Sequence, residues 1–316
     1  MKIAYTVKKI DEGKKLKDII KKKLYVSNVL LSKLKLTNSV LVNDTSKHAS
    51  YTLCENDRIL LDFENMNNVI YNDKNNVCYK KEKYLDKYQR FEYDLDILYE
   101  DEYLLIVNKP ANMAVHPSCA NYESTLSNAV ATYLEKQDIY SIHIVTRLDK
   151  NTSGICIFAK NEYIQELFIR KKEEVKIQKE YIAVVNNIVK KDHEIIEQPI
   201  SRKENSIILR EVNINGDYAK TEYFVKKRNI TENYTILSII LHTGRTHQIR
   251  VHMGAIGHVL LGDTLYAKEY RISNIDNLIK RQALHSHIIS FNHPITGKFI
   301  KIESHIPDDI LNLIKK

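Results

Sequence analysis

The sequence contains no tryptophan, no evident internal repeat and only four cysteines. The cysteines lie far apart and form no C-x-x-C pair, so their spacing fits neither a zinc site nor a disulfide framework. We therefore expect no metal, and we expect these thiols to be buried in a reducing compartment. They are Cys54, Cys78, Cys119 and Cys156.

Long hydrophobic runs are also missing. The N-terminus has no apolar stretch of signal-peptide length, and no run approaches the roughly 20 residues that span a membrane. We expect a soluble, cytoplasmic protein without membrane contact. With 316 residues and 43% hydrophobic content, the chain can bury a full core and form one large domain plus something smaller.

Basic residues outnumber acidic ones, 48 to 40, which gives a net charge of +8 and suits a polyanionic partner. Residues 1–63 hold thirteen Lys and Arg against seven Asp and Glu, so six of the eight excess charges lie there. The pattern indicates a basic appendage on a nearly neutral body.

Two helices and a small sheet are predicted in this basic segment. Apolar residues recur at helical spacing between 16 and 24, and Ser27 is placed to cap a second helix with apolar residues between 29 and 34. Strands are predicted at 40–42 and 59–61. The arrangement resembles the S4 RNA-binding domain. The resemblance implies RNA contacts for lysines of the two helices, although a solvated helix face would look similar. These lysines are Lys21, Lys22, Lys33 and Lys35.

We divide the chain into an S4-like domain at 1–63, a linker at 64–93 that is rich in Asn, Lys, Asp and Tyr, and a larger domain at 94–316. The larger domain is predicted to have more strands than helices. Helices are expected at 163–172, at the C-terminus with Pro307 at its first position, and after Thr246 as N-cap. Without regular strand–helix alternation, this predicts an α+β fold rather than a doubly wound parallel sheet. The expected strands are 104–107, 155–159, 181–185, 207–209, 234–241 and 288–291.

Residues 147–154, RLDKNTSG, form a turn-rich loop directly before a predicted strand. Loops held by rigid strands often carry reactive side chains. Taken alone, Arg147 and Asp149 could simply satisfy each other in a salt bridge.

Five segments, including this loop, resemble in order the conserved blocks of the RluA-type pseudouridine synthases, and together they cover roughly 94–306. The family usually has His where Thr146 stands and Gly where Ala111 stands, which bears on local geometry or RNA contacts. Arg147, Leu148 and Asp149 match. The other segments are NKPANMAVHP at 108–117, KEYIAV at 179–184, HTGRTHQIRVH at 242–252 with GDTLY at 262–266, and RQALH at 281–285 with HPITG at 293–297. The resemblance implies a pseudouridine synthase fold with a mixed or antiparallel sheet.

The implied reaction breaks the N1–C1′ bond of uridine, rotates the base and joins C5 to C1′. It involves no redox change and needs no cofactor, so a sheltered carboxylate nucleophile is sufficient. The resemblance implies that Asp149 has this role. Desolvation alone would raise the pKa of Asp149, and the resemblance points to Arg250 as the opposing cation.

Three further residues receive roles from the resemblance. Tyr181 would stack on a flipped uracil and exchange a proton, Ile249 would pack against the base, and Arg147 would occupy the space that the flipped nucleotide vacates. For Tyr181 and Ile249 the alternative is an ordinary core residue, and for Arg147 it is a structural salt bridge.

The predicted substrate is RNA, most simply 23S ribosomal RNA with transfer RNA possible, and the predicted state is a monomer. One alternative is a noncatalytic RNA-binding or ribosome-assembly factor on the same fold. Another is a retaining glycosidase, which normally needs a paired carboxylic acid that the matched segments do not offer. A metal site at His242, His247 and His252 is rejected, because a spacing of five suits neither a helix face nor a strand face.

Overall fold

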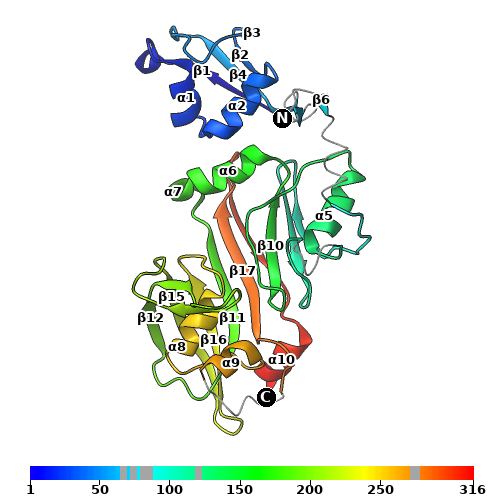
Figure 1. Ribbon diagram of the computed structural model, residues 1–316, viewed down its shortest axis with the longest axis vertical. Coiled ribbons are helices and arrows are strands. Elements are labelled where there is room, and N and C mark those ends of the chain that lie inside the picture. The colour runs from blue at the N-terminus through cyan, green and yellow to red at the C-terminus, as the bar shows by residue number, and fades with distance from the viewer. Residues whose placement is uncertain (65–69, 72–76, 79–87, 118–122, 271–277) are drawn as a thin grey trace.

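A computed structural model describes residues 1–64, 70–71, 77–78, 88–117, 123–270 and 278–316 (Figure 1). Most of the predicted linker therefore lies outside the described residues, as does Cys119. Within the linker, β5 (Ile70–Tyr71) pairs with β6 (Val77–Cys78). Cys156 is buried as predicted, but Cys54 is exposed, so the prediction of a buried thiol is wrong there. No helix in the described parts is long and apolar enough to cross a membrane.

The N-terminal part is a four-stranded antiparallel sheet with two α-helices (Figure 1). Ser27 caps α2 as predicted, since its hydroxyl accepts a hydrogen bond of 3.0 Å from the Leu30 amide. Asn43 and Asp44, both at positive φ, form the turn between β2 and β3. The elements are β1 (Lys2–Thr6), the 3-10 helix η1 (Lys9–Asp11), α1 (Leu16–Lys22), α2 (Asn28–Leu36), β2 (Val40–Val42), β3 (Thr45–Ser46) and β4 (Arg58–Asp62).

The larger part is built on one mixed, ten-stranded sheet, whose main path runs β12-β15-β16-β11-β17-β10-β8-β7. All its pairs are antiparallel except β10 with β17, so the predicted α+β fold is confirmed. The strands are β7 (Ile97–Glu100), β8 (Leu104–Lys109), β9 (His143–Ile144), β10 (Ser153–Ala159), β11 (Gln178–Asn186), β12 (His193–Glu197), β15 (Lys220–Asn229), β16 (Tyr234–Leu241), β17 (Leu284–Asn292) and β18 (Phe299–Glu303).

Helices and one separate hairpin lie against this sheet. The hairpin joins β13 (Ile200–Arg202) to β14 (Arg210–Val212), and its tip contains 207–209. The predicted strand there is wrong: Ile207 is 83% exposed, so no neighbouring strand or core covers it. The helices are α5 (Leu126–Glu135), α6 (Glu162–Arg170), α7 (Lys172–Val175), α8 (Gln248–Ala255), α9 (Thr264–Glu269) and α10 (Asp308–Lys315).

Two predicted helix starts need correction. Pro307 is the N-cap of α10 and not its first helical residue. Thr246 is not the cap of α8, because His247 takes that place in a left-handed backbone conformation with φ 59°. Gly257, at φ 86°, follows the C-cap Ile256 at the end of α8.

The parallel pairing of β10 with β17 joins the two halves of the large sheet. Gly154 has φ 112°, and a Cβ atom at this position would lie 2.2 Å from the carbonyl oxygen of Ser286. Only glycine permits this approach. On its other side Ser286 is paired with Tyr181 of β11. The pairing therefore brings the end of the 147–154 loop and Tyr181 to the same row of the sheet.

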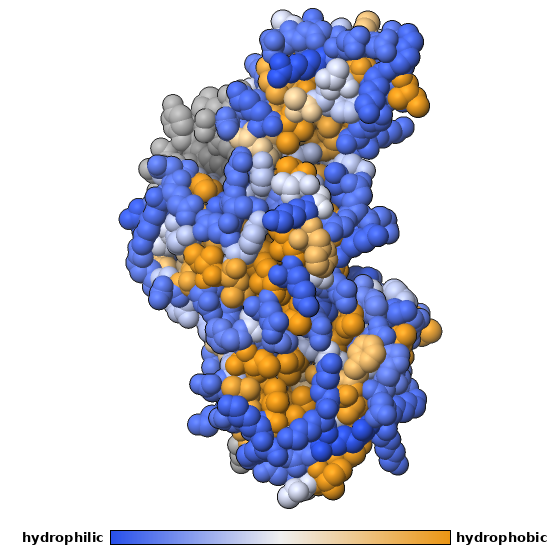
Figure 2. Space-filling model, turned by 180° about the vertical axis from the view of Figure 1, so that it is seen from behind, coloured by the Kyte–Doolittle hydropathy of each residue, from blue (hydrophilic) through white to orange (hydrophobic). Residues whose placement is uncertain are grey.

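One hydrophobic cluster joins the N-terminal part to α6 and the sheet behind it. The Phe63 and Tyr163 rings stack with their centroids 4.7 Å apart, and the Tyr163 hydroxyl donates to the Leu24 carbonyl at 3.0 Å. Seen from behind, hydrophilic side chains follow most of the outline, and hydrophobic ones gather in the middle of the face (Figure 2). The N-terminal part is thus packed against α6.

Candidate active site

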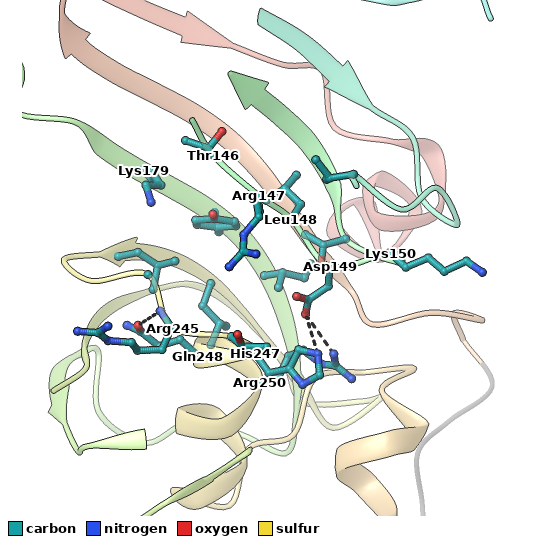
Figure 3. Close-up of a pocket in the computed structure, with 18 of the residues that line it drawn as sticks. Thr146, Arg147, Leu148, Asp149, Lys150, Lys179, Arg245, His247, Gln248 and Arg250 are labelled. Carbon is teal, nitrogen blue, oxygen red and sulfur yellow. Dashed lines mark hydrogen bonds and ion pairs between the residues drawn. The ribbon is translucent and has the colours of Figure 1, made fainter. Parts of the chain in front are cut away.

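A cavity of about 560 Å³, called the central cavity below, lies between the 144–150 segment, β11 and the start of α8 (Figure 3). Among the described residues that line it, Asp149 is the one carboxylate, whereas five Lys and Arg side chains contribute to the wall. Such an excess of positive charge around a hollow attracts a polyanion. The basic residues are Arg147, Lys150, Lys179, Arg245 and Arg250.

The loop that carries Asp149 is fixed from behind by two buried cations. Lys109 Nζ donates to the Lys150 carbonyl at 3.0 Å, and Arg281 Nη1 donates to the Asn151 carbonyl at 3.1 Å. Where the loop begins, the Thr146 hydroxyl accepts a hydrogen bond of 2.9 Å from the Ile157 amide of β10. The backbone on both sides of Asp149 is therefore held by named hydrogen bonds.

Asp149 faces Arg250, as the sequence predicts. Arg250 Nη1 lies 3.1 Å from Asp149 Oδ2, while Arg250 Nε and Nη2 donate to the two oxygens of Asp263 at 2.6 and 2.9 Å. Burial disfavours the guanidinium charge, but Asp263 and, to a smaller extent, Asp149 raise the pKa of Arg250 above its usual value. Arg250 thus stays charged between two carboxylates.

His247 approaches the same carboxylate from the N-cap of α8. Its Nε2 lies 3.8 Å from Asp149 Oδ2, and its Nδ1 lies 2.9 Å from the Tyr266 hydroxyl. Burial lowers the pKa of His247, although the charge of Asp149 opposes this shift. Figure 3 shows Asp149 pointing toward both His247 and Arg250.

Tyr181 and Ile249 both line the central cavity and belong to one hydrophobic cluster. They are 5% and 3% exposed, so each is also a core residue. Burial raises the pKa of the Tyr181 phenol, which keeps it protonated at neutral pH. A flat apolar wall with one hydroxyl suits a planar, polar ring.

The other predicted residues divide between two places. Arg147 is exposed and points into the central cavity, which Lys179 also lines (Figure 3). Lys33 of α2 instead forms an ion pair of 2.6 Å with Glu162 of α6. The structure does not bring the lysines of α1 and α2 to the central cavity: Lys21, Lys22, Lys33 and Lys35 are absent from its lining.

Sequence reasoning missed four residues of this region: Lys109, Lys179, His247 and Asp263. Each belongs to a segment that was matched to the family, so the matches marked the positions without giving them roles. His247 was considered only as a metal ligand, and Asp263 is separated by 13 positions from Arg250, which it holds.

Comparison with known proteins identifies the family. The profile of the RNA pseudouridylate synthase family matches residues 103–255. The chain is 36% identical over 222 residues to the uncharacterized RNA pseudouridine synthase YjbO of Bacillus subtilis, covering 70% of this chain and 76% of that protein. It is 37% identical over 229 residues to ribosomal large subunit pseudouridine synthase D of Haemophilus influenzae, covering 70% of each.

Solved structures support the same fold. Human RNA pseudouridylate synthase domain containing 4 matches with a TM-score of 0.55 and 19% identity, over 69% of this chain and 91% of that one. Human RNA pseudouridylate synthase domain containing 1 matches with a TM-score of 0.52 and 21% identity, over 68% of this chain and 84% of that one. The fold and the sequence relatives agree, and this chain belongs to the RNA pseudouridylate synthase family of isomerases that act on RNA, as the RluA-type motifs predict.

Proposed function

We propose that this protein converts uridine to pseudouridine in large-subunit ribosomal RNA, with Asp149 as the nucleophile. The observation that carries the proposal is the Asp149 carboxylate, 3.1 Å from Arg250, in a cavity to whose described wall five Lys and Arg side chains contribute. The relative from Haemophilus influenzae, 37% identical, is by its name a large-subunit enzyme, which supports the choice of RNA.

The residues of the central cavity fit the steps of this reaction. Attack of Asp149 on C1′ would displace the base, whose N1 takes the bonding electron pair. The phenol ring of Tyr181 and the side chain of Ile249 would hold the freed uracil while it turns, so that C5 can join C1′ and release the carboxylate. C5 then loses its proton and N1 takes one up from solvent, which completes the isomerisation. The base must first leave its helix, and Arg147, exposed at the mouth, is suited to the vacated space.

The test uses ribosomal RNA that carries tritium at C5 of uridine. Wild-type protein should release tritium, and Asp149→Asn should lose release by at least a thousandfold while RNA binding stays within about threefold. Asp138→Asn is the matched control, since Asp138 is an exposed aspartate in a left-handed conformation that asparagine tolerates. Normal release by Asp149→Asn would overturn the assignment.

We further propose that residues 1–63 form an S4-like RNA-binding domain and that the protein acts as a monomer in the cytoplasm. Lys21, Lys22 and Lys35 lie on α1 and α2 and are suited to phosphate contacts. Changing all three to Gln should weaken RNA binding and reduce its salt dependence. The rate of tritium release from RNA that is already bound should stay unchanged. An unchanged salt dependence would contradict the RNA-binding role.

A further inference from the structure

The two oxygens of the Asp149 carboxylate have different surroundings. Arg250 Nη1, at 3.1 Å, and His247 Nε2, at 3.8 Å, both face Oδ2. In the described parts of the chain no hydrogen bond reaches Oδ1. The site therefore holds one oxygen and leaves the other available.

The orientation of His247 depends on Tyr266, a fully buried residue of α9. The Tyr266 hydroxyl oxygen accepts a hydrogen bond of 3.1 Å from the Arg210 backbone amide and lies 2.9 Å from His247 Nδ1. A backbone amide can only donate, so the hydroxyl must accept from Arg210. Its own single proton is then available to His247 Nδ1.

This hydrogen bond determines where His247 carries its proton. If Nδ1 accepts from Tyr266, the neutral imidazole has its proton on Nε2, which faces Asp149. The opposite tautomer would point the lone pair of Nε2 at the carboxylate, and its Nδ1–H could not accept a hydrogen bond from the Tyr266 hydroxyl. Burial, together with the charges of Arg250 and Arg210, lowers the pKa of His247 against the opposing effect of Asp149 and Asp263, which favours the neutral ring.

The backbone of His247 also departs from its usual conformation. Its φ of 59° is uncommon for a residue other than glycine, and histidine is among the side chains that tolerate it better. The imidazole stands edge-on to the Tyr266 ring, with the centroids 5.6 Å apart and the planes at 89°. Left-handed backbone conformations of residues other than glycine are concentrated at functional sites.

We propose that His247 is a positioning residue for Asp149. Once RNA is bound, His247 donates its Nε2–H to Asp149 Oδ2, and Asp149 Oδ1 is left to attack C1′ of the uridine. Catalytic hydrogen bonds are often long before the substrate binds, so a separation of 3.8 Å fits this role. The Oδ1–C1′ bond forms as the C1′–N1 bond breaks, N1 takes the electron pair, and His247 keeps its proton throughout. The inference rests on the function proposed above.

A neutral donor suits the nucleophile better than a second cation. Another positive charge beside Asp149 would stabilise the carboxylate anion further and make it less reactive. The imidazole N–H instead orients Oδ2 without adding charge, and the Tyr266 hydroxyl fixes the imidazole.

The first test is Tyr266→Phe, which removes only the hydroxyl and keeps the ring that lies 4.8 Å from the Arg250 guanidinium carbon. Single-turnover tritium release from saturating RNA should fall about tenfold or more, with the dissociation constant for RNA within about twofold. Tyr270→Phe is the control, because its ring stacks on Tyr266 while its hydroxyl donates to the Val251 carbonyl. Its rate should stay within about twofold of wild type.

The second test does not depend on activity. Nitrogen NMR of histidine-labelled protein should show His247 protonated at Nε2 and not at Nδ1, and Tyr266→Phe should make the two tautomers mix. A wild-type rate for Tyr266→Phe, or a proton on Nδ1, overturns the proposal. If wild-type protein does not isomerise uridine while the NMR result holds, the proposed function fails and the tautomer assignment stands.

Discussion

The backbone amide of Ser27 donates a hydrogen bond of 2.8 Å to the carboxylate of Glu166, which joins the start of α2 to α6. A carboxylate at a helix N-terminus is favoured by the helix dipole and by the unpaired amides of the first turn. Glu162 and Glu174 also bond to the N-terminal part, through Lys33 and the Tyr25 hydroxyl. Three acidic residues of α6 and α7 therefore hold the N-terminal part in place.

Replacing Glu166 by alanine should loosen this junction. The junction is expected to lose about 1–2 kcal/mol of stabilisation, because one charged hydrogen bond and one favourable contact with the helix dipole are removed. Amide exchange at Ser27 and along α2 should accelerate about tenfold, while exchange in β17 stays unchanged. Glu173→Ala, an exposed acid of α7, is the control. Equal acceleration in β17 would show a general loss of stability instead.

The sequence predicted the elements in which local pattern and burial agree. Strand β16 matches its prediction residue for residue, because Tyr234–Leu241 is a largely apolar run and six of its eight residues are buried. Strand β15 was missed, since its sequence KTEYFVKKRN is mostly polar and becomes a strand by pairing with β12 and β16. Ile207 and Ile208 look like a strand but lie exposed at a hairpin tip.

The same distinction holds for the site. The contact between Asp149 and Arg250 follows from family motifs and from the charge that a nucleophile requires. The support behind that pair depends on tertiary contacts: Asp263 comes from the turn before α9, and Lys109 reaches the loop from the end of β8. No local pattern specifies which buried charge meets which carbonyl.

Asp263 is expected to contribute to both stability and activity, because Arg250 lies between the carboxylates of Asp263 and Asp149. In the proposed reaction Asp149 becomes an ester and loses its charge, so that of these two carboxylates only Asp263 still compensates the buried guanidinium. Asp263→Asn should lower the free energy of unfolding by about 3–5 kcal/mol and slow single-turnover tritium release at least a hundredfold. Asp217→Asn, an exposed partner of Arg245 at 3.6 Å, should change neither. A stable, active Asp263→Asn variant would contradict this role.

Lys179 is expected to stabilise the displaced base. Breaking the N1–C1′ bond leaves negative charge on uracil, and Lys179 lines the central cavity together with Tyr181. Lys179→Met should lower the single-turnover rate constant about a hundredfold with RNA affinity nearly unchanged, and Lys179→Arg should restore part of it. Lys190→Met, an exposed lysine, is the control. Weaker RNA binding with an unchanged rate would instead assign Lys179 to a phosphate.

Lys109 should give the protein a distinctive dependence of stability on pH. Burial lowers its pKa from 10.5 to about 8, and its ammonium group donates to the carbonyls of Pro110, Met113 and Lys150. Below pH 8 the lysine is charged in both the folded and the unfolded state, and the folded state bears the full cost of burying that charge. Between pH 8 and 10.5 only the unfolded state keeps the proton, so stability rises with pH across this window.

The comparison that isolates this effect is wild type against Lys109→Met, since other lysines and tyrosines titrate in both proteins. The difference in unfolding free energy, wild type minus variant, should grow by up to about 3 kcal/mol from pH 8 to 10.5. Denaturant unfolding at several pH values measures it. The variant should also release tritium more slowly, because the carbonyl of Lys150, next to Asp149, loses its donor. A difference that stays constant with pH would mean that Lys109 keeps an ordinary pKa in the fold.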